Sequence, residues 1–250
     1  MSEAIRLAWH QFHLERRMLW RNPSAAFFNM ALPLIFLALF GAVFNDDRDS
    51  LEIIVPGIAG MAVMATTFNS LSMNLTFLRE QGVLKRIRGS AMPEGAYLTA
   101  VLASSVFNAV IQVVLITLAG RIFFDIGWPK DVAALAVFVA AGVACMGSLG
   151  IALSHVIPNF ESASAYSNAI FLPMILISGT FFDTANTPAF LRDIAQALPL
   201  THLIQGLKGA MITGHGVADN ASNLAVVALW AAFGVFFAIR GFSWESRQAG

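Results

Sequence analysis

Long apolar runs alternate with short polar stretches along most of this 250-residue sequence. An α-helix needs about 20 consecutive apolar residues to cross the hydrocarbon layer of a bilayer. Runs of about that length lie at residues 24–44, 53–77, 97–124, 132–153, 163–181 and 221–239. The pattern therefore predicts an all-α polytopic membrane protein with six transmembrane helices, forming a single domain over residues 1–250 with the bundle at 24–240.

Residues 1–22 are too charged to cross a membrane, yet their apolar residues recur every three or four positions. These apolar positions are Ile5, Ala8, Trp9, Phe12, Leu19 and Trp20. The spacing predicts an N-terminal amphipathic helix in the membrane interface, where Trp side chains favour headgroup depth. A soluble basic arm is the alternative.

The connection at residues 182–219 is too long and too apolar for an ordinary loop. Pro188 and Pro199 divide it into two short segments, 189–197 and 200–212, and neither is long enough to span a bilayer. The sequence predicts a re-entrant or interfacial outer helical hairpin between spans five and six, because irregular backbone is tolerated at membrane depth where protein buries it.

The composition is typical of a membrane protein, and the positions of its charged residues predict how it is oriented in the membrane. Hydrophobic residues make up 57% of the chain and charged residues 12%, whereas soluble domains carry about 25% charged residues. Lys and Arg gather at residues 1–22, 78–93 and 240–250, and short basic segments are retained on the cytoplasmic side. Both termini, including the tail at 241–250, are expected in the cytoplasm, with the spans in the plasma (inner) membrane. The net charge is zero, so no nucleic-acid partner is expected.

The densest charge cluster lies between spans two and three, at residues 78–93. Its charged members are Arg79, Glu80, Lys85, Arg86 and Arg88. At helical spacing, Val83, Leu84 and Ile87 share one side, which predicts a short amphipathic helix at the cytoplasmic surface. Two interpretations stay open: the charges only set the topology, or they dock on another protein.

Span two is unusually polar for a membrane helix. Its candidate functional face comprises Thr66, Asn69, Ser70, Met73, Asn74 and Phe77. These side chains either bond to neighbouring helices, a common use of polar residues in membranes, or face a substrate pathway or a second copy of the chain. The sequence does not separate the two interpretations.

Recognisable catalytic and metal-binding motifs are absent from the sequence. It contains no G-x-x-x-x-G-K-[ST] loop, no G-x-S-x-G, no H-E-x-x-H and no C-x-x-C, and His155 and the single cysteine, Cys145, have no ligand partners at suitable spacing. We therefore expect no metal or cofactor on this chain. No span carries an ionisable residue near its middle, as an ion-coupled carrier would. This favours a permease whose energy arrives from outside the membrane.

Several stretches are similar to motifs of one known family. Residues 79–88 read REQGVLKRIR, similar to the R-E-x-G-[TV]-L-x-x-[LI] segment in the membrane subunits of ABC-2 type exporters, including the daunorubicin-resistance and nodulation-factor permeases. Residues 178–182 (SGTFF) and 198–201 (LPLT) are similar to the S-G-x-x-F and L-P-L-T elements around that family's re-entrant outer helices. The resemblance covers essentially the whole chain.

The resemblance implies half of a transporter, with ATP hydrolysis in a separate subunit. The segment between spans two and three would be a coupling helix docked on a cytoplasmic P-loop ATPase. Its candidate ATPase-coupling residues are Arg79, Glu80, Gln81, Gly82, Lys85, Arg86 and Arg88. Two ATPases would bind ATP and Mg²⁺, and a second copy or a related permease would complete the assembly in the membrane lipid.

Aromatic, Met and neutral polar residues in spans two and five favour a hydrophobic or amphipathic cargo, such as a drug, a lipid or a lipid-linked molecule. Such a cargo would leave the cytoplasm or the inner leaflet. The alternatives are a membrane-embedded lipid-modifying enzyme and a scaffold subunit without transport activity. Paired carboxylates, which an enzyme would need, occur only in the acidic outer loop at residues 45–52.

Overall fold

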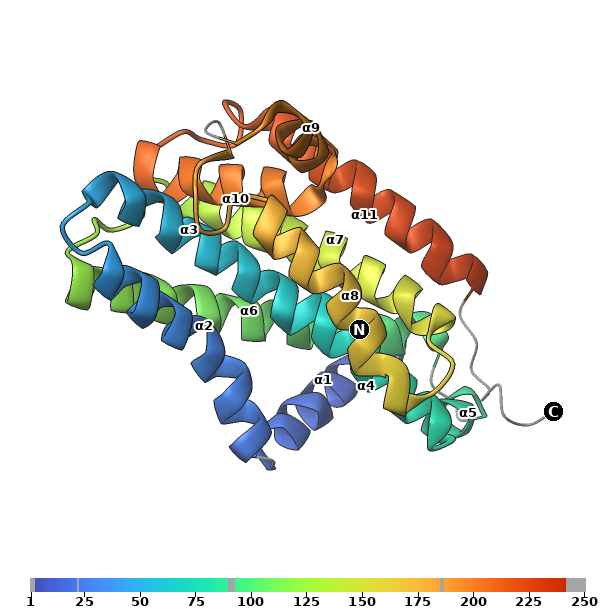
Figure 1. Cartoon of the computed structure of the whole chain (residues 1–250). Coiled ribbons are helices and arrows are strands. Elements are labelled where there is room, and N and C mark those ends of the chain that lie inside the picture. The colour runs from blue at the N-terminus through green and yellow to red at the C-terminus, as the bar shows by residue number, and fades with distance from the viewer. Residues whose placement is uncertain (1–2, 22, 90–92, 185–186, 242–250) are drawn as a thin grey trace.

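The computed structural model describes residues 3–21, 23–89, 93–184 and 187–241, and every regular element in this part of the chain is helical. The helices are α1 (Glu3–Arg21), α2 (Pro23–Val43), α3 (Arg48–Met64), α4 (Ser70–Glu80), α5 (Val83–Arg88), α6 (Glu94–Phe124), α7 (Val132–Val156), α8 (Phe160–Ile177), α9 (Ala189–Ala197), α10 (Pro199–Lys208) and α11 (Ala221–Gly241). A π-helical turn at Ala65–Asn69 joins α3 to α4, and another at Gly209–Thr213 ends α10. The long helices form one bundle (Figure 1).

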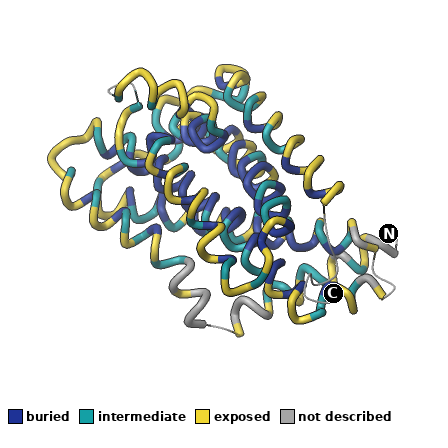
Figure 2. Tube along the Cα trace, turned by 45° about the vertical axis from the view of Figure 1, so that its right-hand side comes forward, coloured by how far each residue is buried: buried dark blue, intermediate teal, exposed yellow. Residues whose placement is uncertain are grey.

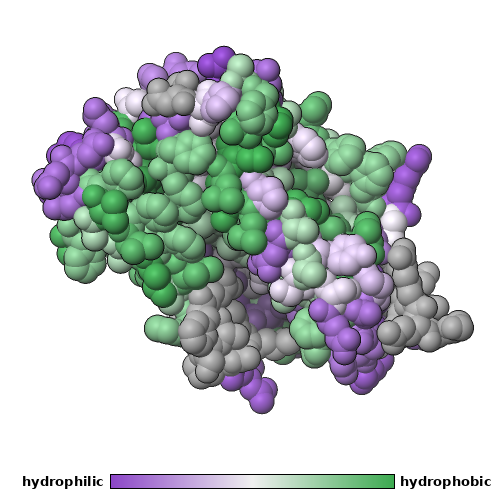
Figure 3. All heavy atoms as spheres, viewed as in Figure 1, coloured by the Kyte–Doolittle hydropathy of each residue, from purple (hydrophilic) through white to green (hydrophobic). Residues whose placement is uncertain are grey.

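Five of the described helices are long and apolar enough to cross a membrane, so the protein is polytopic. They are Arg48–Glu80, Gly95–Phe124, Val132–Val156, Phe160–Ile177 and Ala221–Gly241. The other expected span corresponds to α2, whose described apolar part, Met30–Val43, is shorter than a span. A six-span count therefore stays a prediction. Apolar residues cover much of the bundle surface between polar ends (Figure 3).

The continuous helix formed by α3 and α4 lies at the centre of the bundle, where buried residues dominate (Figure 2). It packs against α2, α6, α7, α8 and α10. Small residues permit this crowding: a Cβ on Gly150 of α7 would lie 2.6 Å from the carbonyl oxygen of Phe68. The absence of a side chain at Gly150 thus lets α7 approach the central helix closely.

Side-chain caps explain where several of these helices begin. Asp47 accepts a hydrogen bond from the Ser50 amide at the start of α3, at 3.3 Å, and Asp131 accepts from the Ala134 amide at the start of α7, at 2.8 Å. Such caps satisfy amides that have no partner within the helix. The first turn of α3 is thus helical, and the central helix begins five residues earlier than its apolar run.

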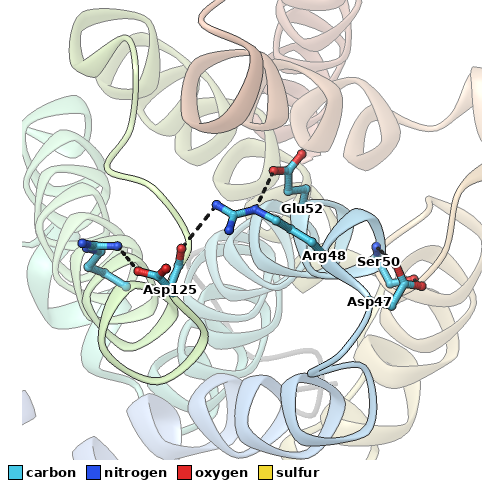
Figure 4. A network of polar contacts seen from close by, with 6 residues as sticks. Asp47, Arg48, Ser50, Glu52 and Asp125 are labelled. Carbon is cyan, nitrogen blue, oxygen red and sulfur yellow. Dashed lines mark hydrogen bonds and ion pairs between the residues drawn. The ribbon is translucent and has the colours of Figure 1, made fainter.

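Polar contacts link the first turn of α3 to the end of α6. Arg48 lies 3.6 Å from Glu52 and donates to the carbonyl oxygen of Asp125 at 3.4 Å, while Arg121 pairs with the Asp125 carboxylate. Figure 4 shows this network, with the Asp47 cap beside it. Within the acidic loop at 45–52, Asp47 and Glu52 therefore have structural contacts, which weakens the enzyme alternative that rested on this loop.

Two short helices follow α8, at the end of the bundle opposite α5 (Figure 1). Most of the α9 side chains are exposed, whereas α10 packs against α3, α7 and α11 and buries Leu200, Leu203 and Leu207. Pro199 occupies the first turn of α10, a position that proline favours because its missing N–H has no helical partner there. The predicted pair of short helices is present; its re-entrance into the membrane stays a prediction.

Candidate functional site

A glycine separates the central helix from the candidate coupling helix. Gly82 has φ +68°, in the left-handed region that favours glycine, so α4 ends at Glu80 and α5 begins at Val83. Leu84 is fully buried in a small apolar cluster with residues of α4, α6, α7 and α11. The opposite side of α5 presents Lys85, which is exposed. This short helix is therefore amphipathic and anchored to the bundle.

The candidate coupling residues divide into two groups in space. Gln81, Lys85 and Arg86 are exposed, and the Arg86 guanidinium donates to the Gln81 carbonyl oxygen at 3.4 Å. The backbone of Arg88 ends α5, but its side chain lies outside the described part of the structure. Lys85 and Arg86 therefore form an exposed basic surface next to Gly82.

Arg79 and Glu80 instead contact the connection between α7 and α8. Arg79 is buried, and its guanidinium donates to the carbonyl oxygens of Ser154, at 2.7 Å, and Ile157. A carboxylate oxygen of Glu80 accepts a hydrogen bond from the amide of Phe160 at 2.6 Å. Sequence reasoning placed both residues in the coupling segment but had no signal for these partners, because they lie about 80 residues away in the chain.

A cavity of about 370 Å³ lies between α2, the central helix and α8. Apolar and amide side chains line it: Leu32, Pro33, Phe36, Met61, Ala65, Asn69, Ser70, Met73, Asn168, Phe171, Leu172 and Ile175. Asn69, Ser70 and Met73 of the predicted functional face are among them. Thr66 is buried, and its hydroxyl donates to the Ala62 carbonyl oxygen at 2.6 Å. Asn74 and Phe77 do not line the cavity.

The backbone is irregular where it borders this cavity. The hydroxyl of Thr67 donates to the Val63 carbonyl oxygen at 2.6 Å, and the π-helical turn begins beside this bond, at Ala65. The Asn69 side-chain oxygen is buried and accepts no hydrogen bond from any residue that the structure describes. Single π-helical turns in α-helices are frequent at functional sites. An apolar wall with a few amide groups suits an amphipathic molecule.

The cavity walls contain residues that sequence reasoning missed. Pro33 and Phe36 come from α2, and Asn168 and Phe171 from α8. Pro33 was visible only as a helix-kinking proline, and Asn168 only as one amide in an apolar run. Nothing in the local pattern says that these helices share a cavity with the central one.

The motifs at 178–182 and 198–201 line one cavity, at the end of the bundle opposite α5 (Figure 1). This smaller cavity, of about 200 Å³, is lined by Ile53, Ser178, Gly179, Phe182, Asp183, Thr184, Thr201, Ile204, Gln205 and Lys208. The buried hydroxyls of Ser178 and Thr201 have no hydrogen-bond partner among the described residues. A cavity with such groups has the polarity to hold water.

A metal ion would require several of the described His, Cys, Asp and Glu side chains to converge on one point. Among them, no group of three His, Cys, Asp or Glu side chains is arranged to hold a metal ion. His155 is buried against α11, with Nε2 3.3 Å from the Ala238 carbonyl oxygen. This contact joins the last turn of α7 to α11, so His155 has a structural partner within its own chain.

Comparison with known proteins identifies the family of this architecture. The chain is similar to nodulation protein J of Sinorhizobium fredii (strain NBRC 101917 / NGR234), at 26% identity over 88% of the chain and 89% of that protein. It is also similar to the daunorubicin resistance ABC transporter permease protein DrrB1 of Streptomyces coeruleorubidus, at 27% identity over 79% of the chain and 74% of that protein. The probable multidrug ABC transporter permease YbhS of Escherichia coli (strain K12) is 24% identical over 69% of the chain and 46% of that protein.

A family model for the ABC-2 type transporter matches residues 8–212, which is most of the chain and includes the basic segment at 78–93 and the cavity between α2, the central helix and α8. A permease of this kind has no ATPase activity of its own and implies an ATPase partner subunit. The chain therefore belongs to the ABC-2 type transporter family, as the membrane permease subunit of an exporter.

Proposed function

We propose that this permease exports hydrophobic or amphipathic molecules through a pathway that includes the cavity between α2, the central helix and α8. The observation that carries the proposal is the lining of that cavity. Met73 and Phe171 offer apolar contact, while Asn69 and Asn168 offer amide hydrogen bonds. Ligand sites commonly combine apolar walls with a few polar groups that orient the ligand.

The energy for export would come from two P-loop ATPases, which bind ATP and Mg²⁺. Lys85 and Arg86 are exposed on α5, and Gln81 and Gly82 lie just before it. Together with Arg88 they form the proposed ATPase docking surface. Arg79 and Glu80 belong to the same coupling segment but face their own chain. A second copy or a related permease would complete the pathway beside α2 and α8.

The docking proposal is tested by purifying the tagged chain from native membranes in mild detergent and identifying co-eluting proteins by mass spectrometry. A P-loop ATPase is expected at near-equal amount with the wild type and to be lost from the double variant Lys85→Glu/Arg86→Glu. Lys130→Glu is the control, because Lys130 is exposed at the other end of the bundle. Equal recovery of the ATPase with all three proteins would contradict the docking surface.

The cargo proposal needs a separate measurement. Vesicles containing the permease and its ATPase are expected to concentrate amphipathic dyes in an ATP-dependent manner, and Ser70→Phe, which fills part of the cavity, is expected to reduce this uptake. Uptake at the wild-type rate by Ser70→Phe would show that cargo does not pass through this cavity.

We also propose that both termini and α5 face the cytoplasm. Lys85→Cys should then react with a membrane-impermeant maleimide only in inverted vesicles, and Asp49→Cys only in intact cells. Both positions are exposed, whereas the native Cys145 is buried and gives little background. Labelling from the opposite sides would reverse the proposed topology.

A further inference from the structure

Arg79 and Glu80 are consecutive residues that cap two different helices. The Arg79 guanidinium donates to the Ser154 carbonyl oxygen in the last turn of α7 and to the carbonyl oxygen of Ile157, which follows it. Glu80 accepts from the amide of Phe160, the first residue of α8. One dipeptide at the end of α4 thus holds the end of one helix and the beginning of the next.

The signs of the two charges match the two helix ends. The last carbonyl groups of a helix carry partial negative charge and favour a cation, whereas the first amides carry partial positive charge and favour an anion. Hydrogen bonds in which one partner is ionised are also stronger than neutral ones. The positive charge of Arg79 therefore lies at the carbonyl end of α7, and the negative charge of Glu80 lies at the amide end of α8.

Two further contacts join α4 to α8. The rings of Phe77 and Phe160 meet edge to face, with centroids 5.1 Å apart. Deeper in the bundle, the hydroxyls of Ser72 and Ser167 lie 2.7 Å apart, and both residues are fully buried. The Glu80 contact is therefore the end of a seam of contacts along the two helices.

This seam borders the cavity between α2, the central helix and α8. Asn69 and Met73 line it near the start of α4, and Asn168 and Phe171 line it from α8. The third wall, α2, contributes the apolar side chains of Leu32, Pro33 and Phe36. Apolar contacts are non-directional, whereas the hydrogen bonds of the seam fix the position of α8 against α4. The wall formed by α4 and α8 is thus better suited to move as one body than to separate.

We propose that Arg79 and Glu80 are positioning residues that attach α7 and α8 to the coupling segment, so that a displacement of α5 moves the α4–α8 wall of the cavity as a unit relative to α2. The proposal rests on the proposed coupling to an ATPase. It assigns these two side chains a role within their own chain and leaves the docking itself to the exposed residues of α5. In this proposal the movement of the ATPase is transmitted first to α5 and then, through Arg79 and Glu80, to the α7–α8 connection.

The test uses the complete complex of permease and ATPase in lipid nanodiscs and follows hydrogen–deuterium exchange with and without ATP and vanadate. In the wild type, nucleotide is expected to change deuterium uptake at residues 82–89 and, with it, at 157–168. In Glu80→Ala the response at 82–89 should persist, while the response at 157–168 is lost. Exchange of the Phe160 amide should also rise about tenfold, since it loses a charged acceptor.

Glu161→Ala is the matched control. Glu161 is an exposed acidic residue in the same first turn of α8, so its removal deletes an equal charge without breaking the link to α4. This variant should keep both responses. Glu80→Gln, which retains an acceptor oxygen, should restore a large part of the response at 157–168; a general loss of stability would not be rescued in this selective way.

Several outcomes would overturn the proposal. A nucleotide response at 157–168 that survives in Glu80→Ala would show that the attachment is not used. A wild-type response at 82–89 without one at 157–168 would show that the two segments move separately. Absence of any wild-type response at 82–89 would instead contradict the proposed function, because α5 would then not receive the ATPase movement.

Discussion

Gly57 of the central helix lies directly against the backbone of Thr180, so closely that a Cβ on Gly57 would lie 2.0 Å from the Thr180 carbonyl oxygen. The contact places the 178–182 motif on α3. Thr180 lies in the bend that follows α8, so the absence of a side chain at Gly57 lets this bend approach the central helix closely.

Gly57→Ala is accordingly expected to destabilise the protein by about 1–3 kcal/mol, the usual cost of forcing an atom into a packed interior. The measurement is the melting temperature of the purified permease in detergent. Gly95→Ala is the control, since a Cβ at Gly95 meets nothing within 4 Å. Similar melting temperatures for the two variants would mean that the close approach is not present in solution.

The hydroxyl pair of Ser72 and Ser167 allows a double-mutant cycle. We expect a coupling free energy of about 0.6 kcal/mol between Ser72→Ala and Ser167→Ala, as is typical of side-chain hydrogen bonds within membrane proteins. Ser164→Ala, at an exposed position of α8, should add to Ser72→Ala without coupling. A coupling free energy of zero between the two substitutions would show that the hydroxyls of Ser72 and Ser167 do not stabilise the contact between α4 and α8.

Substitution of Asn69 distinguishes a role of this residue in cargo recognition from a role in the stability of the protein. Its side-chain oxygen is buried without a partner among the described residues, so Asn69→Leu should leave the melting temperature unchanged or raise it. The same change should alter which amphipathic compounds stimulate ATP hydrolysis by the complex. Asn74→Leu, outside the cavity lining, should leave that selectivity unchanged. A loss of stability with unchanged selectivity in Asn69→Leu would favour a purely structural amide.

The docking of α1 on α6 is expected to depend on pH through Glu15. Burial raises the pKa of Glu15 above its ordinary value of 4.5, although a hydrogen bond from Gln11 partly opposes the shift. A raised carboxyl pKa means that the docked helix binds a proton more readily than the undocked one. Docking should therefore strengthen as the pH falls from neutral through the raised pKa, and the gain should level off below 4.5.

This docking is followed by the fluorescence of Trp9 on α1 against pH, in a variant whose other four tryptophans are replaced by Phe. Glu15→Gln should abolish the pH dependence while keeping α1 docked, because the neutral amide needs no proton. The cation–π contact between Arg16 and the ring of Phe107 also holds α1 against α6. A pH dependence that persists in Glu15→Gln would assign it to another group.

Much of the fold was visible in the hydrophobic pattern. The predicted helix at 189–197 begins and ends where α9 does, and the predicted span at 132–153 falls within α7. Larger differences occur where a cap extends a helix beyond its apolar run: Asn159 accepts from the Ser162 amide, so α8 begins at Phe160 rather than at residue 163. A bilayer demands apolar length, and caps add polar turns that hydropathy does not register.

The sequence by itself determined the class of protein, the approximate extents of the long apolar helices and the position of the basic segment at residues 78–93, because membrane insertion depends on local hydropathy and charge. Only the tertiary structure decided that Arg79 and Glu80 face the α7–α8 connection while Lys85 faces outward. It alone placed Asn69 and Asn168 around one cavity. Helical spacing tells which side a residue takes on its own helix, but the neighbour on that side is set by how distant helices pack.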